Sequence, residues 1–376
     1  MQKKTYRERK NMKEIVIDGK KIGGDNPVFI VAEMSANHNG DYNRAVEIMH
    51  AAKEAGADAI KIQTYTADTI TLDSDKPYFK ITQGTLWDGR TLYDLYKEAY
   101  TPWEWQADLA KEAKKIGLTF FSSPFDFSAV DFLEKLDVPC YKIASFEITD
   151  IPLIKKIAKL QKPVIFATGI AYKDDIKLAL DTCRAEGNDQ IILLKCTSAY
   201  PAPFEAVNLE MIPYLAGEFD CISGLSDHTM GYSVAIASVA KGAKLIEKHF
   251  TLSRADGGAD SAFSMEPEEF RQMCTGVRQV EKALGKVGFD LSEKQIKERE
   301  HTRSLFVSAD IKAGEVFSDR NIRSVRPGYG LHTKYYEEIL GKTALCDLTP
   351  GTPLDWKYIK GFENRENTDC PAGVKP

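Results

Sequence analysis

Eight short β-rich runs alternate with longer amphipathic stretches between residue 28 and about residue 286, and this alternation constrains the fold most strongly. Strands that alternate with helices form parallel sheets, because each helix carries the chain back to the end where the previous strand began. Eight such units in one domain predict an α/β fold of the (β/α)8 TIM-barrel type. The strands are expected at 28–35, 59–65, 119–124, 140–146, 163–169, 191–199, 221–228 and 244–251.

The predicted strands share a second feature, since each begins apolar and finishes in polar residues. In a barrel these ends lie on one rim, the carboxyl face, where barrel enzymes place their active sites. A single polar strand end is usually the start of a solvated loop, whereas eight of them favour a shared site. The polar ends are Glu33 and Ser35, Gln63, Ser122 and Ser123, Ser145 and Glu147, Thr168, Thr197 and Ser198, Asp227 and His228, and His249.

The last predicted strand, "LIEKHFT", holds three consecutive ionisable residues. Alternation along a strand points Glu247 and His249 to one side and Lys248 to the other. We expect Glu247 to support the site or a buried lysine, and Lys248 to pair with a carboxylate on a helix. A lone histidine is more often a core residue than a ligand. Because His228 ends the neighbouring strand, the two imidazoles together predict a divalent-metal site completed by water.

Two lysines, Lys61 and Lys142, lie inside predicted strands, where a buried ammonium needs an anion. That anion is either a protein carboxylate, with Glu33, Glu147 and Asp227 as candidates, or a group on a ligand. Two cations beside many hydroxyl side chains suit a small, highly charged anion such as a phosphorylated acid. A lysine that forms a Schiff base with a carbonyl substrate is the competing chemical interpretation.

Composition and charge exclude several other classes of protein. The net charge of −5 provides no basic field for nucleic acid, and no apolar run is long enough to span a bilayer. The first residues lack the apolar stretch of a secretion signal. Seven scattered cysteines, odd in number and never spaced C-x-x-C, are typical of reduced thiols. These features predict a cytoplasmic protein that binds neither nucleic acid nor membranes.

The regular alternation breaks in two places. The aromatic-rich segment 66–105 is too long for a simple connector, and we expect it either to fold over the rim or to pack as an ordinary excursion. Beyond the last helix, a charged stretch leads to short β-like runs punctuated by Gly and Pro, which predict a small second domain. The expected organisation is an N-terminal extension (1–27), a barrel (28–286), a linker (287–304), a second domain (305–361) and a disordered tail (362–376).

Nine motifs resemble, in order, those of the sialic acid synthase family, and they span most of the chain. They are "VAEMSANHNG", "AIKIQTY", "FFSSPFD", "YKIASFE", "ATGI", "CTSAYP", "GLSDHT", "EKHFT" and "GADSAFS". The later segments "RSLFVSADIKAGEVF" and "NIRSVRPGYG" resemble the family's C-terminal antifreeze-like domain, a small β-clip known as the SAF domain. The resemblance therefore implies a TIM barrel followed by a small β-clip domain.

The resemblance also implies a reaction. The family joins phosphoenolpyruvate to the aldehyde form of an N-acylated amino sugar, with release of phosphate, to make a nonulosonic acid. It uses a divalent metal, Mn²⁺ or Mg²⁺, which by resemblance is held by His228 and His249 and polarises the aldehyde. Glu33 matches the residue that handles protons. Family members form homodimers in which the SAF domain of one chain covers the barrel mouth of the other.

Individual binding residues follow from the matched motifs. By resemblance, the positions that hold phosphoenolpyruvate are Lys61, Ser123, Lys142, Ser145, Ser198 and Ser226. The positions that bind the sugar are Gln63, Glu147, Tyr200 and Asp260, together with Arg326, which the family delivers across the dimer interface.

Two departures bear on the substrates. Ala167 replaces the family's serine before Thr-Gly, so a main-chain amide is expected to replace that phosphate donor. The Gly-Ala-Asp segment and the long insert resemble the pseudaminic acid synthases, whose sugar is 2,4-diacetamido-2,4,6-trideoxy-L-altrose. Such a sugar lacks a 6-hydroxyl and needs apolar lining, for which Trp87, Tyr93, Trp103 and Phe263 are candidates.

Three alternatives stay open at this point. Within the family, the sugar could be that of an N-acetylneuraminate or a legionaminic acid synthase. A Schiff-base barrel aldolase would instead use Lys61 or Lys142 covalently. A non-catalytic SAF-type binding protein would release no phosphate with any sugar, and the filled polar rim argues against it.

Overall fold

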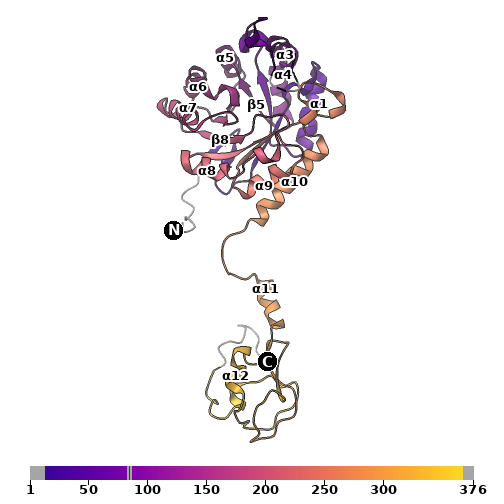
Figure 1. The fold of residues 1–376 in the computed structure, drawn as a ribbon, viewed down its shortest axis with the longest axis vertical. Coiled ribbons are helices and arrows are strands. Elements are labelled where there is room, and N and C mark those ends of the chain that lie inside the picture. The colour runs from indigo at the N-terminus through magenta and orange to yellow at the C-terminus, as the bar shows by residue number, and fades with distance from the viewer. Residues whose placement is uncertain (1–12, 83, 85–86, 367–376) are drawn as a thin grey trace. The chain divides into compact units, whose positions relative to one another are not determined.

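The computed structural model describes residues 13–82, 84 and 87–366. The chain divides after Gly285 into two compact units, the first containing the barrel and the second the C-terminal residues (Figure 1). Most of the predicted disordered tail, residues 367–376, lies outside the described residues. Among the residues that are described, no helix combines the length and the apolar character needed to cross a membrane.

The first unit is built on a closed barrel of parallel strands, as the alternation predicted. The strands follow one another in chain order, and the last pairs with the first, with His249 opposite Glu33. This pairing closes the ring and brings the two ends of the barrel sequence together. The strands are β3 (Phe29–Glu33), β4 (Ala59–Thr64), β5 (Thr119–Pro124), β6 (Tyr141–Ile143), β7 (Val164–Ala167), β8 (Ile191–Cys196), β9 (Ile222–Asp227) and β10 (Leu245–His249).

Amphipathic helices surround the barrel (Figure 1). In the first of them the Asp41 side chain caps the helix by accepting hydrogen bonds from two backbone amides, and the helix buries Ile48 and Met49. The main core fills the space between strands and helices. The helices are α1 (Tyr42–Glu54), α4 (Trp103–Lys115), α5 (Phe127–Lys135), α6 (Ile151–Ala158), α7 (Lys173–Ala185), α8 (Met211–Phe219), α9 (Ser233–Ala240) and α10 (Pro267–Ala283).

A β-hairpin precedes the barrel, in a region that the sequence analysis treated only as an extension. Its strands are β1 (Glu14–Ile17) and β2 (Lys20–Gly23), and both residues of the Asp18-Gly19 turn have positive φ. This is the conformation that two-residue hairpin turns require. Three buried isoleucines of the hairpin join the apolar side chains inside the barrel, among them Phe29 and Phe121. The hairpin thus packs onto the end of the barrel where the strands begin, opposite the polar rim.

The long segment between β4 and α4 contains α2 (Ala67–Ile70) and α3 (Leu92–Ala99). An isolated antiparallel bridge joins Lys80 to Thr91 and folds the chain back on itself. The Trp87 indole nitrogen donates a hydrogen bond of 3.2 Å to the Ala259 carbonyl, in the loop that follows β10. The segment therefore reaches the polar rim, which agrees with the expectation that it folds over the rim.

The second unit is small and rich in turns. Antiparallel strands β11 (Ser304–Val307) and β12 (Ile322–Val325) accompany the short helices α11 (Glu293–Glu298) and α12 (Tyr336–Ile339). A compact core forms around Trp356. Phe362 and Arg365, in the segment expected to be a tail, stack against this tryptophan, with the Arg365 guanidinium carbon 3.9 Å from its ring centroid.

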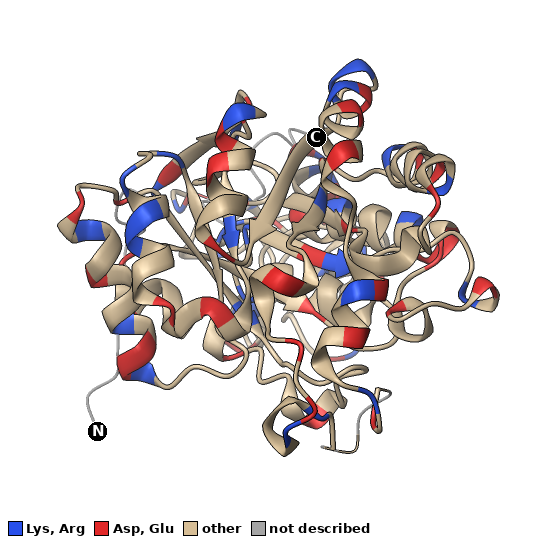
Figure 2. Ribbon diagram, turned by 90° about the horizontal axis from the view of Figure 1, so that it is seen from above, with Lys and Arg blue, Asp and Glu red and all other residues tan. Residues whose placement is uncertain are grey.

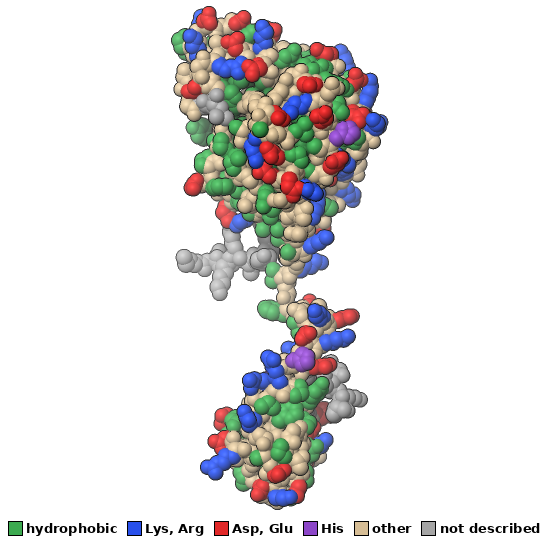
Figure 3. Space-filling model, turned by 90° about the vertical axis from the view of Figure 1, so that its right-hand side faces the viewer, with side chains coloured by type: hydrophobic (Ala, Val, Ile, Leu, Met, Phe, Trp, Pro, Cys, Tyr) green, Lys and Arg blue, Asp and Glu red, His purple; other side chains and the backbone are tan. Residues whose placement is uncertain are grey.

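Charged side chains of both signs lie interspersed in two views of the molecule. In the ribbon view of Figure 2, both signs alternate along the outer helices. Acidic and basic side chains are likewise interspersed on the face drawn in Figure 3.

Candidate active site

Two histidines meet at the rim, where β9 and β10 lie side by side. His249 ends β10, His228 directly follows β9, and their ring centroids are 5.3 Å apart. The Nδ1 atom of His228 lies 2.9 Å from the Thr197 carbonyl oxygen. Because a carbonyl can only accept, this Nδ1 carries the proton, and Nε2 keeps a free electron pair. Hydrogen bonds of this kind orient imidazoles that bind metals.

His249 is buried, and within the described part of the chain its Nδ1 atom has no hydrogen-bond partner. Burial, reinforced by the neighbouring His228 and nearby lysines, holds its pKa well below the ordinary value, so the ring is neutral at neutral pH. No third His, Cys, Asp or Glu of the described residues joins the pair in a cluster that could hold a metal. Two adjacent imidazoles, with no third protein ligand among the described residues, match the predicted pattern, which leaves the remaining positions to water or substrate.

Four ionisable side chains form a buried cluster inside the barrel, just below the histidines. The Lys61 Nζ atom lies 2.6 Å from a Glu33 oxygen and 3.5 Å from a Glu247 oxygen. Lys142 approaches the same Glu247 oxygen at 3.3 Å. The expectation that protein carboxylates accompany the buried lysines is therefore confirmed for Glu33 and Glu247. Two ammonium and two carboxylate groups balance formally, which makes their joint burial tolerable.

The four groups of this buried cluster differ in protonation behaviour. Burial raises the pKa of Glu33, whereas for Glu247 the nearby Lys142 and Lys61 outweigh burial and lower the pKa. Burial also lowers the pKa of Lys142. Of these two carboxylates, Glu33 is consequently the one that takes up a proton more readily, while Glu247 favours the ionised form and balances the lysines.

Serine hydroxyls surround the lysines, as predicted. The Lys61 ammonium donates to the Ser123 hydroxyl at 3.4 Å, and the Ser226 hydroxyl donates to Glu247 at 3.4 Å. The backbone amide of Gly169 donates to the Ser145 hydroxyl at 3.2 Å. This amide lies near the end of β7, where a main-chain donor was expected to compensate for Ala167.

The remaining predicted serine, Ser198, has a buried hydroxyl with no partner among the described residues. A Cβ atom added at Gly169 would lie 2.1 Å from that hydroxyl and 2.6 Å from the Ser145 hydroxyl. Any side chain at position 169 would therefore fill the space between them. The Ser145 and Ser198 hydroxyls and the Gly169 amide thus lie together, and with the strand lysines they are the kinds of group that form a cradle for an anion.

Aromatic rings form a wall beside the histidines. The Tyr200 ring lies 4.4 Å from that of His228, 5.1 Å from that of Phe263 and 6.0 Å from that of Trp87, centroid to centroid. Phe263 also lies 5.0 Å from His249. Trp87 and Phe263 thus lie beside the site, as expected of an apolar lining.

Two other aromatic residues predicted to line the site do not join this wall. Trp103 donates to the Tyr65 carbonyl at 3.0 Å and packs on Phe132 of α5. The Tyr93 hydroxyl donates to Asp68 of α2 at 3.0 Å. Both side chains serve the packing of the long segment, so the prediction for them was wrong.

Predicted sugar-binding residues gather on the Glu33 side of the rim. The Gln63 side-chain amide donates to Glu33 at 3.1 Å and to the Ser35 hydroxyl at 3.0 Å. The Ser35 hydroxyl in turn donates to Asp260. Ser35 has a φ of +46°, a conformation that costs a residue with a side chain roughly 1–2 kcal/mol. The sequence analysis placed Ser35 at the polar end of the first strand but assigned it no part in binding or catalysis.

The remaining sugar-binding candidate on the barrel, Glu147, follows β6 and is half-buried, with one carboxylate oxygen buried and lacking a partner within the described residues. Arg326 is exposed and directly follows β12 in the second unit. Its role at the sugar stays a prediction.

Lys248 does not pair with a helix carboxylate, as the sequence analysis had expected. Its ammonium lies 2.7 Å from the Asp227 carboxylate and donates to the Thr229 carbonyl at 2.6 Å, with both side chains buried. The partner is thus on the neighbouring strand, and the predicted helix carboxylate was wrong. The reason is register, because Lys248 pairs directly with Asp227 between β10 and β9, which places both side chains on the same outer face.

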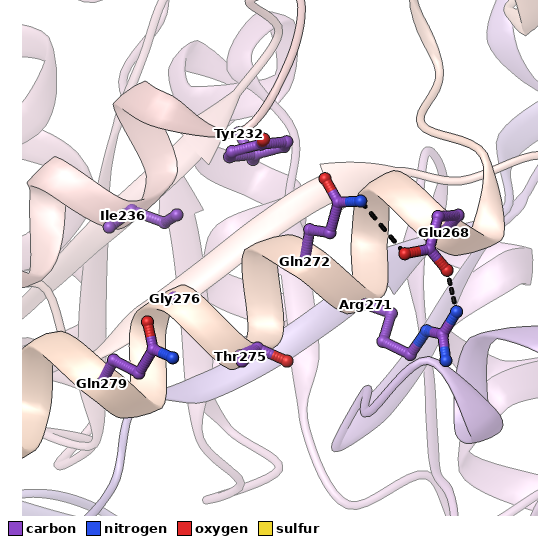
Figure 4. Close-up of a pocket in the computed structure, with 8 residues that line it drawn as sticks. All are labelled: Tyr232, Ile236, Glu268, Arg271, Gln272, Thr275, Gly276 and Gln279. Atoms are coloured by element: carbon purple, nitrogen blue, oxygen red, sulfur yellow. Dashed lines mark hydrogen bonds and ion pairs between the residues drawn. The ribbon is translucent and has the colours of Figure 1, made fainter.

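A groove of about 500 Å³ also lies on the outside of the barrel, between α9 and α10 (Figure 4). The helices approach closely there, since a Cβ added at Gly276 would lie 2.3 Å from the Ile236 side chain. Along α10, Glu268 binds Arg271 and Gln272 (Figure 4). The groove contains none of the predicted site residues, and its lining is what ordinary helix packing produces.

Replacement of Glu147 by glutamine is expected to change how the stability of the barrel unit depends on pH. Burial raises the pKa of Glu147 to about 7 from its ordinary 4.5. Between these values the folded protein holds a proton that the unfolded chain has released, so stability falls as the pH rises. Relative to E147Q, the wild type should lose up to about 3 kcal/mol between pH 5 and pH 8. Urea unfolding of both proteins at pH 5 and pH 8 measures this. A difference in the free energy of unfolding between them that is the same at both pH values would contradict the prediction.

Comparison with known proteins gives the same picture. The NeuB family model matches residues 48–288, and the SAF domain model matches residues 302–360. The chain is 48% identical to the pseudaminic acid synthase of Campylobacter jejuni over 330 residues, which are 88% of this chain and 96% of that protein. The pseudaminic acid synthase of Helicobacter pylori is 47% identical over 87% of this chain and 96% of its own length.

Among solved structures, the N-acetylneuraminic acid synthetase of Leptospira borgpetersenii in complex with citrate matches with a TM-score of 0.69 and 31% identity, over 76% of this chain and 95% of that one. The family model covers more than half of the chain, and the relatives match nearly from end to end. These findings confirm the resemblance read from the motifs at the strand ends: the chain belongs to the NeuB family and carries a SAF domain.

Proposed function

We propose that the protein condenses phosphoenolpyruvate with 2,4-diacetamido-2,4,6-trideoxy-L-altrose and water to give pseudaminic acid and phosphate. The observation that carries the proposal is the presence, on one rim, of the groups of an anion cradle and a pair of adjacent histidines. The cradle contains Lys61, Lys142 and the Ser198 hydroxyl, whose partner is missing among the described residues. The names of the two relatives at 47–48% identity support the same reaction.

The carbon–carbon bond forms first. Lys61 and Lys142, with the serines at 123, 145, 198 and 226, hold the phosphate and carboxylate of phosphoenolpyruvate. C3 of phosphoenolpyruvate attacks the aldehyde carbon of the sugar, and the aldehyde oxygen takes a proton from Glu33. The raised pKa of Glu33 suits it to this donation.

The carbon–oxygen bond then breaks. Water adds to C2, which has become electron-deficient, and gives its proton to the Glu33 carboxylate, so Glu33 returns to its starting state. The bond between C2 and the oxygen that carries the phosphorus then cleaves, and phosphate leaves with the electron pair. The hydroxyl that remains on C2 loses its proton as the ketone forms. Glu247 stays ionised throughout and keeps both lysines charged for the leaving phosphate.

His228 and His249 would hold the divalent metal, Mn²⁺ or Mg²⁺. The fit rests on two features: the Nε2 electron pair of His228, left free by the bond from Nδ1 to Thr197, and the buried Nδ1 of His249, which lacks a partner in the described chain. Nitrogen ligands favour manganese over magnesium, which prefers oxygen. When bound, the metal supplies Lewis-acid polarisation of the sugar aldehyde.

The aromatic wall supports the choice of sugar. Trp87, Tyr200 and Phe263 offer apolar faces next to the histidines, which suits a 6-deoxy sugar with two acetamido methyl groups. Gln63, Glu147 and Asp260 supply the polar contacts to the sugar hydroxyl and amide groups. An N-acetylneuraminate or legionaminic acid synthase is the nearest alternative.

The assembly and its location complete the proposal. We take the protein to be a homodimer in which the SAF domain of one chain covers the barrel of the other and brings Arg326 to the sugar. The exposure of Arg326 leaves it available for such a contact. A cytoplasmic location is supported by the described cysteines, all of which are free thiols.

An assay with three sugars tests the proposal. Purified enzyme with phosphoenolpyruvate and Mn²⁺ is expected to release phosphate with the trideoxy-altrose and to discriminate against N-acetylmannosamine and the legionaminic precursor by at least about 100-fold in kcat/KM, because buried polar groups would otherwise lack partners. Product from N-acetylmannosamine alone would overturn the choice of sugar. A mass adduct trapped by borohydride, with activity unaffected by EDTA, would instead establish the Schiff-base aldolase.

A further inference from the structure

Ser35 occupies a backbone position that favours glycine. It follows β3, is 3% exposed and has a φ of +46°, in the left-handed region. Glycine would adopt this conformation without a steric cost. A serine here is therefore explained only if its side chain does something that glycine cannot do.

The contacts of Ser35 link three residues of the site. Its backbone amide donates to Glu33 at 3.1 Å, and its hydroxyl accepts a hydrogen bond of 3.0 Å from the Gln63 side-chain amide. The same hydroxyl donates to the Asp260 carboxylate. Gln63 also donates to Glu33 at 3.1 Å. One hydroxyl thus connects the ends of β3 and β4 to a loop that lies 225 residues further along the chain.

The direction of these hydrogen bonds fixes the orientation of two groups. Asp260 receives the Ser35 hydroxyl proton on one oxygen, which leaves the carboxylate held at a defined angle. The Gln63 amide nitrogen is occupied by Ser35 and Glu33, so its carbonyl oxygen points away from them. Without the hydroxyl, Asp260 would lose this donor, and Gln63 would lose one of its two acceptors.

We propose that Ser35 is a positioning residue that orients Asp260 and Gln63 for the sugar, and that the site requires its hydroxyl rather than its backbone conformation. The inference rests on the proposed function, because it assigns those two residues to the sugar. It does not assign Ser35 to phosphoenolpyruvate, because the hydrogen bonds of its hydroxyl go to Asp260 and Gln63 and not to a residue proposed to hold that substrate.

Two substitutions distinguish the effect of the hydroxyl from the effect of the backbone conformation. Ser35→Gly removes the hydroxyl and relieves the left-handed conformation, whereas Ser35→Ala removes the hydroxyl and keeps the steric cost. Both variants are expected to raise KM for the sugar at least tenfold, with KM for phosphoenolpyruvate within twofold of the wild-type value. The melting temperature is expected to be higher for S35G than for S35A. Activity should therefore follow the hydroxyl, while stability should follow the backbone.

Asp137→Gly is the matched control, since Asp137 has a φ of +53° and lies before β6, at the end of the barrel away from the rim. It should leave both KM values unchanged. A sugar KM for S35G equal to that of an active wild type would overturn the assignment, because Ser35 would then be only a turn residue. An equal rise in both KM values would also overturn it. A wild type that makes no product from any of the three sugars would overturn the proposed function itself.

Discussion

Replacement of His249 by alanine is expected to reduce phosphate release by a factor of about 100 to 1,000 while the barrel stays folded. His249 and His228 are the only pair of histidines that the described residues bring together at the rim, with ring centroids 5.3 Å apart. Loss of one imidazole leaves a single protein ligand, which is too few to hold a divalent ion. The fold should tolerate the change because the Nδ1 atom of His249 has no hydrogen-bond partner to lose among the described residues.

Two measurements check this prediction. The first is phosphate release with Mn²⁺, phosphoenolpyruvate and the trideoxy-altrose. The second is the melting temperature with and without Mn²⁺, because an ion that binds the folded state raises it. Mn²⁺ should stabilise the wild type and leave H249A unchanged. His50→Ala is the control, since His50 lies on α1, bonded to Glu112, and should behave as the wild type. An H249A protein that still gains stability from Mn²⁺ would show that the metal binds elsewhere.

Replacement of Glu247 by glutamine is expected to destabilise the barrel unit by about 3 kcal/mol, because it leaves two buried ammonium groups with one carboxylate. Glu247 is the group that both lysines share, at 3.5 Å from Lys61 and 3.3 Å from Lys142. The exposed pair of Glu210 and Lys241 provides the control. Glu210→Gln should cost less than about 1 kcal/mol, since water screens that pair.

Urea unfolding measures the E247Q effect, and its pH dependence has a definite sign. The lysines lower the pKa of Glu247 below its ordinary 4.5 in the folded protein. The stability that Glu247 contributes is therefore present above about pH 5 and should be lost as the pH falls through the folded pKa. Phosphate or phosphoenolpyruvate should restore part of the stability of E247Q, because an anion can replace the missing carboxylate. A stability equal to that of the wild type at pH 7 would contradict the role of Glu247.

Much of the candidate site followed from patterns that are local in sequence. The polar ends of the strands placed Glu33, Lys61 and the serines on one rim, because parallel strands in a barrel all end on the same side. Parity along "LIEKHFT" put Glu247 and His249 on the inside, and both are found there, Glu247 beside the lysines and His249 beside His228. These inferences needed only the two-residue period of a strand and the order of the strands.

Other features were missed for a different reason. The hairpin at the N-terminus carries Asp18-Gly19 between alternating apolar residues, a signal that could have been read, but the sequence did not show that its isoleucines would enter the barrel. Trp103 and Tyr93 were candidates for the apolar lining of the sugar that the resemblance implied, yet their partners are Phe132 and Asp68. Nothing in the amino-acid order distinguishes an aromatic residue that faces the rim from one that packs the segment itself.

The sequence by itself determined the barrel, the rim, the pair of histidines and the strand lysines, because each of these depends on periodicity within a run and on the topology of parallel strands. Only the tertiary structure decided which side chains meet across the rim: Lys248 with Asp227, Ser35 with Asp260, and Trp87 with Tyr200. These partners come from different strands and loops. Their distances depend on register, loop path and packing, which are set by the whole chain at once and leave no local pattern.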